Sequence, residues 1–133
     1  MKKVLFVLSF VAVMVSCSKS PVDEAVAILE NSEKEFAAAD SYKAMGDALL
    51  NFAKEADAFV KANKDFKPQG EDLKKIQEAE AKMGKAMEAA GNNLEKKYAG
   101  KEDEAMADLA MFSVMGEIEK NYPDAKEFSF SKD

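Results

Sequence analysis

The chain of 133 residues contains no histidine, no tryptophan and no arginine, and it has one cysteine. Without histidine it lacks the most common acid–base catalyst and the most common zinc ligand. Without arginine it lacks the side chain that most often binds phosphate or carboxylate groups in a bidentate way. Because its formal net charge is −6, it also lacks the basic surface that nucleic-acid binding needs. We therefore expect no nucleic-acid partner, no metal and no cofactor.

The remaining polar side chains form no recognisable catalytic motif. Glu102-Asp103-Glu104 and Asp23-Glu24 are typical of the first turn of a helix, where negative charge is favourable. Neither run has the alternating ligands and central glycine of a calcium-binding loop. No nucleophile can be paired with a histidine base, since there is no histidine. The sequence therefore predicts a protein that is not an enzyme.

The first residues have the form of a secretory signal. Met1-Lys2-Lys3 is basic, and the run from Val4 to Val15 is apolar apart from Ser9. A basic start followed by a short apolar stretch and a small residue is typical of exported proteins. The run is too short to cross a bilayer, which takes roughly 17–25 apolar residues.

Met14-Val15-Ser16-Cys17 resembles the lipobox of bacterial lipoproteins, although Leu is more usual at the position of Met14. The resemblance implies cleavage between Ser16 and Cys17 and a lipid on the sulfur of Cys17. It also implies a cell-envelope protein, anchored in the outer membrane because Ser18 replaces the aspartate that retains lipoproteins in the inner membrane. The side of the membrane stays open. The alternatives are an ordinary secretory signal with an incidental cysteine, or an uncleaved membrane helix.

After cleavage the chain would keep 117 residues, with 17 lysines against 25 carboxylates, which suffices for one domain. We divide the full chain into a signal peptide at 1–16, a lipidated tether at 17–21, a helical domain at 22–121 and a tail at 122–133. Glycine and proline are scarce, with six and three residues. Lysine, glutamate and alanine dominate, and this composition favours helices.

Apolar residues at helical spacing predict four helices, near 22–39, 42–63, 71–99 and 102–121. The second helix has the clearest pattern, with alternating steps of three and four: Tyr42, Met45, Leu49, Phe52, Ala56, Phe59. In the third helix Glu80 occupies one position of the apolar stripe, and a kink or break is expected near Gly91. The fourth helix has the widest apolar set, so we expect it to be the most buried.

The predicted fold is therefore all-α, an up-down antiparallel bundle of about four helices that follows the cleaved signal helix. The alternative is a long helical hairpin in which the first two helices fuse across Asp40-Ser41 and the chain dimerises. Aromatic residues at helical spacing are assigned to the core. Those in the loop and the tail are candidates for a contact surface: Phe66, Tyr122, Phe128 and Phe130.

Six methionines lie on or near the predicted apolar faces: Met45, Met83, Met87, Met106, Met111 and Met115. We assign them to core filling, although methionine-rich helices also suit adaptable binding surfaces. The predicted function is a helical module for protein interaction or scaffolding, held to the membrane by the lipid on Cys17. Its partner is an unknown protein or a second copy of the chain. The alternative function is binding of an apolar or lipid-like ligand between the methionine-rich helices.

Overall fold

The computed structural model describes residues 20–99 and 103–130, with the side chains of 103–111 left out. These residues contain four α-helices, a short 3-10 helix and no strand. The helices are α2 (Pro21–Ala38), α3 (Tyr42–Ala62), α4 (Gly70–Tyr98) and α5 (Asp103–Asn121), and the 3-10 helix is η1 (Pro123–Glu127). The prediction of an all-α fold with four helices after residue 20 is confirmed.

Serine side chains cap the first two helices. The Oγ of Ser20 accepts a hydrogen bond from the N–H of Asp23 at 3.2 Å, and the Oγ of Ser41 accepts one from the N–H of Ala44 at 3.0 Å. Such caps satisfy backbone donors that have no partner inside a helix. Since α2 ends before Asp40 and α3 begins after Ser41, the two helices are separate. The alternative in which they fuse is wrong.

The third predicted helix is continuous. Gly70, at the start of α4, has φ of +61°, a conformation that lets the chain turn after Pro68 and that suits glycine. Glu71 and Asp72 lie in the first turn and Lys96 and Lys97 in the last turn, which complements the helix dipole. α4 runs through Gly91 without interruption, so the helix does not break there.

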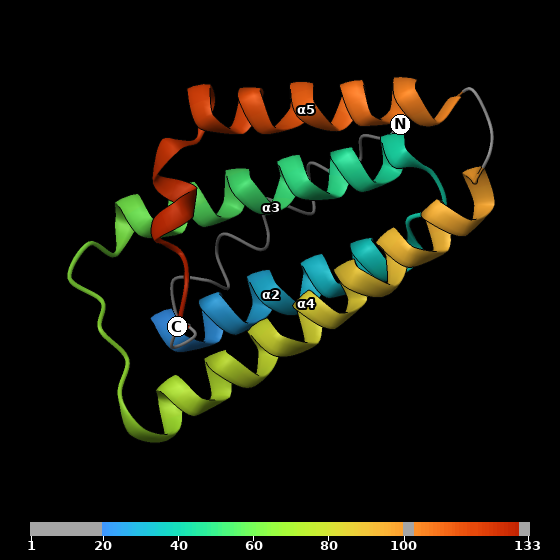
Figure 1. The fold of residues 1–133 in the computed structure, drawn as a ribbon. Coiled ribbons are helices and arrows are strands. Elements are labelled where there is room, and N and C mark those ends of the chain that lie inside the picture. Colours follow the sequence, from blue (N-terminus) through green and yellow to red (C-terminus); the bar gives the residue numbers. More distant parts are fainter. Residues whose placement is uncertain (1–19, 100–102, 131–133) are drawn as a thin grey trace, which may run out of the picture.

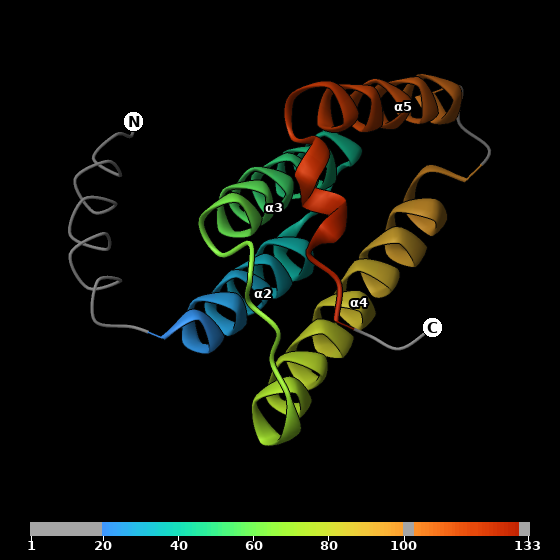
Figure 2. The same ribbon diagram turned by 90° about the vertical axis from the view of Figure 1, so that its left-hand side faces the viewer.

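The helices alternate in direction along the chain, and α2 lies between α3 and α4 (Figure 1). α5 packs along the side of α3 that faces away from α2 (Figure 2). The spatial order is therefore α4, α2, α3, α5. Among the described helices, only α2 packs closely along α4. The bundle is open between α4 and α5, because neither α3 nor α5 covers the free side of α4.

The core is centred on one stripe of α2. Ala25, Leu29, Ser32 and Phe36 follow one another at steps of four, three and four, and each is at most 3% exposed. The largest fully buried side chains come from α2 and α4 alone: Phe36, Leu29, Ile76 and Leu94. The contact between α2 and α4 therefore carries the tightest packing in the described part of the protein.

The expectation that the last helix is the most buried is wrong for residues 112–121. Phe112 is 79% exposed and Met115 is 54% exposed, and none of these ten residues is buried. The reason is geometric: α5 packs mainly on α3 and, to a lesser extent, on η1. One side of α5 is covered, and the other apolar side faces solvent. The structure does not describe the other side chains assigned to the apolar face of this helix before residue 112, which are Ala105, Met106, Leu109 and Met111.

The substitution Phe36→Ala should lower the free energy of unfolding by about 3–5 kcal/mol, since it leaves a cavity where a fully buried ring now packs. The matched substitution Phe112→Ala should change it by no more than about 0.5 kcal/mol, because that ring is mostly in solvent. Urea unfolding followed by circular dichroism measures both. Equal losses would contradict the placement of the core on α2.

Candidate functional site

The C-terminal segment crosses the molecule from α5, over α3, to α4 (Figure 1). Asp57, which is 5% exposed on α3, fixes the start of η1. Its Oδ1 accepts a hydrogen bond from the N–H of Asp124 at 2.9 Å, and its Oδ2 accepts one from the Nζ of Lys61 at 2.7 Å. The hydrogen bond from Lys61, and to a lesser extent that from Asp124, lowers the pKa of Asp57, although burial alone would raise it. The hydrogen bond with Asp57 also raises the pKa of Lys61.

Five phenyl rings join this segment to α3 and to the loop before α4. Phe128 packs edge to face on Phe52 at 5.8 Å between ring centroids, and on Phe59 at 5.3 Å. Phe66 contacts Phe59 at 5.5 Å and Phe130 at 6.3 Å. Each such pair contributes about 0.5–1.5 kcal/mol beyond the area it buries. We call these residues the aromatic cluster: Phe52, Phe59, Phe66, Phe128 and Phe130.

The segment ends on α4, where polar side chains hold the backbone of Phe130. The Nε2 of Gln77 donates to the carbonyl oxygen of Phe130 at 2.7 Å. Both carboxylate oxygens of Glu80 lie 3.3 Å from the backbone nitrogen of Phe130, which donates to them. Glu80, which interrupts the apolar stripe of the sequence, is therefore used to attach the tail to α4.

The structure brings together three of the four predicted contact residues. Phe66, Phe128 and Phe130 belong to the aromatic cluster, whereas Tyr122 lies at the end of α5, where its N–H donates to the carbonyl of Ile118. Phe128 is 5% exposed, so it is an interior residue rather than a surface residue. Phe66 and Phe130 are half-buried. The predicted cleavage and lipidation residues, Ser16 and Cys17, lie outside the described residues.

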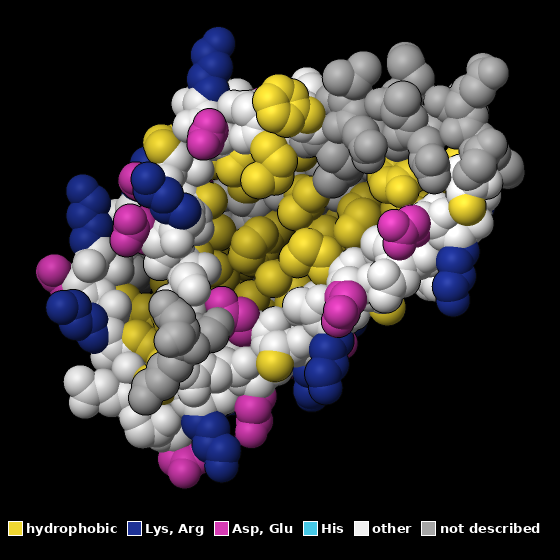
Figure 3. All heavy atoms as spheres, viewed as in Figure 1, with side chains coloured by type: hydrophobic (Ala, Val, Ile, Leu, Met, Phe, Trp, Pro, Cys, Tyr) yellow, Lys and Arg dark blue, Asp and Glu magenta, His cyan; other side chains and the backbone are white. Residues whose placement is uncertain are grey.

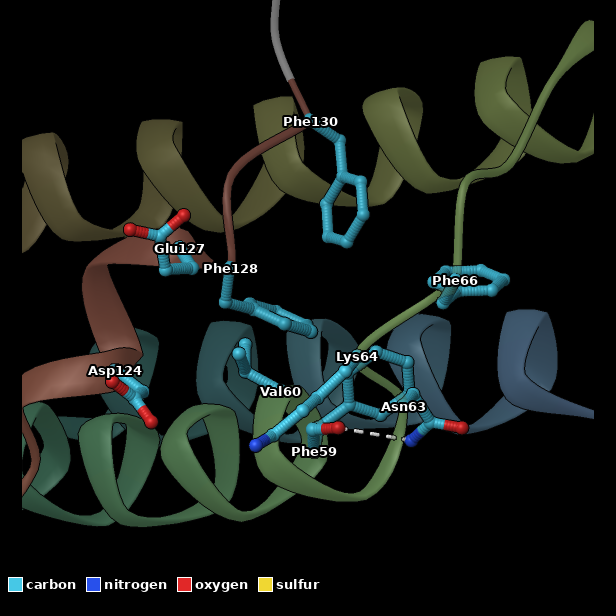
Figure 4. A pocket seen from close by; sticks show the side chains of 9 residues that line it. All are labelled: Phe59, Val60, Asn63, Lys64, Phe66, Asp124, Glu127, Phe128 and Phe130. Atoms are coloured by element: carbon cyan, nitrogen blue, oxygen red, sulfur yellow. Dashed lines mark hydrogen bonds between the residues drawn. The ribbon is translucent and has the colours of Figure 1, made fainter.

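A cavity of about 410 Å³ opens beside the aromatic cluster (Figure 4). Its apolar wall consists of four phenyl rings and Val60, and its polar wall includes Asn63, Lys64, Asp124 and Glu127. The Nδ2 of Asn63 donates to the carbonyl of Phe59 at 2.9 Å, which fixes the end of α3. Among the described residues that line it there is no hydroxyl, thiol or imidazole side chain.

A second feature lies between α3 and α4. Three contacts identify the side of α4 that faces α3 and the tail. Glu80 binds Phe130, a Cβ at Gly91 would lie 4.0 Å from the Cε of Met45, and the ring of Tyr98 lies 5.5 Å from that of Tyr42. Met87 follows Glu80 by seven residues and precedes Gly91 by four, so it lies on this same side.

The facing side of α3 is equally apolar. Leu49 follows Met45 by four residues and precedes Phe52 by three, which places it opposite α4. Leu49 and Met87 both pack against the core, and both remain half-buried in the part of the chain that the structure describes. We call this surface the apolar groove, defined by Met45, Leu49 and Phe52 on α3 and by Gly84, Met87 and Gly91 on α4.

Figure 3 shows the apolar groove as a hollow with a continuous hydrophobic floor between α4 and the layer of α3 and α5. The tail, which carries Phe128, closes it at one end, and the pair Tyr42 and Tyr98 lies at the other end. Lys97 also fixes this second end, because its Nζ donates to the carbonyl of Asp40 at 2.8 Å. Phe112 and Met115 are the exposed large apolar side chains of the described part of α5.

The described residues offer no alternative site of a common kind. No group of three or more potential ligands among them could hold a metal ion. Within the same residues, none of the helices has the length and apolar character to cross a bilayer.

No protein-family model, no curated protein and no solved structure matches this chain. The function must therefore be argued from the geometry described above.

Reasoning from the sequence missed both Asp57 and the apolar groove. Asp57 interrupts no apolar stripe, and its partner in the tail is 67 positions away. The groove residues Leu49 and Met87 lie on predicted core stripes, which do not tell whether a helix covers them. Gly84 and Gly91 could have indicated the groove. They lie seven residues apart on one face of the helix, and that face therefore lacks bulky side chains at two positions.

The substitution Asp57→Asn should destabilise the fold at neutral pH and have a smaller effect in acid. The folded-state pKa of Asp57 is lowered, so its ionised form stabilises the fold above the ordinary aspartate range near 4. That contribution is lost as the pH falls through the lowered pKa. Urea unfolding at several pH values measures the difference between the variant and the native chain.

Asp47→Asn is the matched control, because Asp47 also pairs with a lysine four residues away, Lys43, but is exposed. It should change stability little at any of these pH values. If the effect of Asp57→Asn stayed the same throughout the acid range, the charge of Asp57 would not be what holds η1.

Proposed function

We propose that this protein is a lipid-anchored component of the bacterial cell envelope that binds a partner protein through the apolar groove. The observation that carries the proposal is the uncovered apolar floor between α4 and the layer of α3 and α5 (Figure 3). Contiguous exposed apolar surface is uncommon on soluble monomers and usually marks an interaction site. The absence of a catalytic constellation in the described part agrees with a binding role.

The lipid anchor rests on the sequence motif that ends at Cys17. α2 begins at Pro21, four residues after Cys17, and a stretch of four extended residues spans about 14 Å at most. A lipid on Cys17 would therefore hold the helical domain close to the membrane surface. A partner bound in the groove would be held at the same place, which is a scaffolding role.

A second candidate function is binding of an apolar or lipid-like ligand in the same groove. Two methionines, Met45 and Met87, lie on its facing walls, and thioether side chains adapt to irregular apolar ligands. The protein partner is preferred because the groove is open along one side, whereas sites for small apolar ligands enclose most of the ligand surface.

The substitution Cys17→Ala should abolish incorporation of a radiolabelled fatty acid and move the protein from the membrane fraction to the soluble fraction. Ser18→Ala is the control, since it changes a neighbouring residue that carries no lipid in this proposal. A variant without Cys17 that still carried the label would show that the lipobox assignment is wrong.

We expect a helix bound between α4 and α5 to contact the exposed apolar side chains of α5 as well as the groove floor. The double substitution Phe112→Ser and Met115→Ser should then weaken binding of an uncharged amphipathic helical peptide of leucine, alanine and glutamine by about tenfold or more. Loss of contacts worth about 1.4 kcal/mol is enough for this change. Fluorescence anisotropy with a labelled peptide measures it. Stability should hardly change, because both side chains are largely exposed.

The double substitution Ala58→Ser and Ala62→Ser is the control, since both alanines are exposed on α3 and neither falls on the side that faces α4. It should leave peptide binding unchanged. Saturable binding of palmitate without any peptide binding would instead support the second candidate function.

A further inference from the structure

We propose that the partner segment is a basic amphipathic helix, which places its apolar face on the floor of the groove and its lysines or arginines against the acidic rim formed by α4. This inference rests on the proposed function and adds the chemistry of the partner. It is carried by the distribution of charge on the helices that border the groove.

The rim formed by α4 is acidic. Glu80, Gly91 and Tyr98 mark the side of α4 that faces α3. Glu88 precedes Gly91 by three residues, and Glu95 follows Gly91 by four and precedes Tyr98 by three. Residues three and four apart share one helix face, so Glu88 and Glu95 lie on the groove side, and both are exposed.

Three lysines of the same stretch lie on the other side of α4, whereas Lys97 reaches the carbonyl of Asp40 at the end of the groove. Lys82 and Lys85 follow Glu80 by two and by five residues, and Lys96 follows Gly91 by five. These spacings correspond to rotations of about 140–200° around the helix axis. Figure 3 agrees, because acidic side chains border the hollow along α4 and lysines project from the outer edge. The segregation gives the groove side of α4 a negative potential.

The exposed face of α5 repeats this combination. Glu119 follows Phe112 by seven residues and Met115 by four, so the carboxylate shares a face with the two exposed apolar side chains. A partner helix that also reaches this face of α5 would meet apolar side chains next to a carboxylate there. Complementary charge of this kind directs encounter and excludes partners of the same sign.

The size of the groove also fits a helix. The stretch of α4 from Glu80 to Tyr98 is about 27 Å long at 1.5 Å per residue, which matches a partner helix of about 18 residues. Helices bind such grooves through apolar residues spaced by three, four and seven positions. A second copy of this chain is a poor occupant, because its own formal net charge is −6.

The test uses two synthetic peptides of about 18 residues with the same leucine and alanine face. One carries lysines on its polar face and the other carries glutamates. The protein is the full chain in nanodiscs of phosphatidylcholine, which have no net charge. Fluorescence anisotropy should show that the lysine peptide binds at least tenfold more tightly, and that raising the salt concentration weakens its binding.

The double substitution Glu88→Gln and Glu95→Gln should weaken binding of the lysine peptide by about two- to tenfold. The control, Glu30→Gln and Glu78→Gln, removes the same number of charges from exposed positions and should leave binding nearly unchanged. Equal losses in the two variants would overturn the inference, since attraction to the whole acidic protein would explain them.

The outcomes distinguish this inference from the proposed function. If both peptides bound equally and lost affinity on Phe112→Ser, the groove would bind partners but the charge preference would be wrong. If neither peptide bound, the proposed function would fail together with this inference. A stable dimer with Phe112 in its interface would also overturn it, because the occupant would be a second copy.

Discussion

The structure depends on the packing of α2 against two helices at once. The buried stripe of α2 is at most 3% exposed at Ala25, Leu29, Ser32 and Phe36. Its small residues, Ala25 and Ser32, let the backbones of neighbouring helices come close to α2. Because α2 lies between α3 and α4, these two helices cannot pack along each other. The groove above α2 is therefore a consequence of how the core is filled, rather than a local defect in an otherwise closed bundle.

Contacts at the two ends hold α3 and α4 in this open arrangement. At one end the rings of Tyr42 and Tyr98 lie 5.5 Å apart. At the other end the tail joins the helices, since Asp57 on α3 binds the N–H of Asp124 and Glu80 on α4 binds the N–H of Phe130. The middle of the groove has no such bridge in the described residues, and this is where Leu49 and Met87 remain half-buried.

Helix positions could be predicted from the sequence, because spacing and capping are local. The alternating steps from Tyr42 to Phe59 predicted α3, and Met45, Ala56 and Phe59 of that stripe are buried. Burial of α5 could not be predicted, because a wide apolar face looks the same whether a neighbour covers it or not. The role of Glu80 was equally hidden, since its partner Phe130 is 50 positions away. Local sequence patterns were thus enough to predict the helices. The site depends on contacts between residues far apart in the sequence, which such patterns do not reveal.

In the proposed function, a lipid anchor, the open apolar groove and the acidic side chains of α4 together hold a partner at the membrane surface. This function requires that the groove be open and that no second copy of the chain occupy it. Light scattering combined with small-angle X-ray scattering on the full chain, in phosphatidylcholine nanodiscs with matched-out lipid, tests this most directly. We expect one monomer per disc, with a scattering profile that fits the helix order α4, α2, α3, α5 and an open groove between α4 and α5. A dimer that dissociates on Phe112→Ser would contradict it.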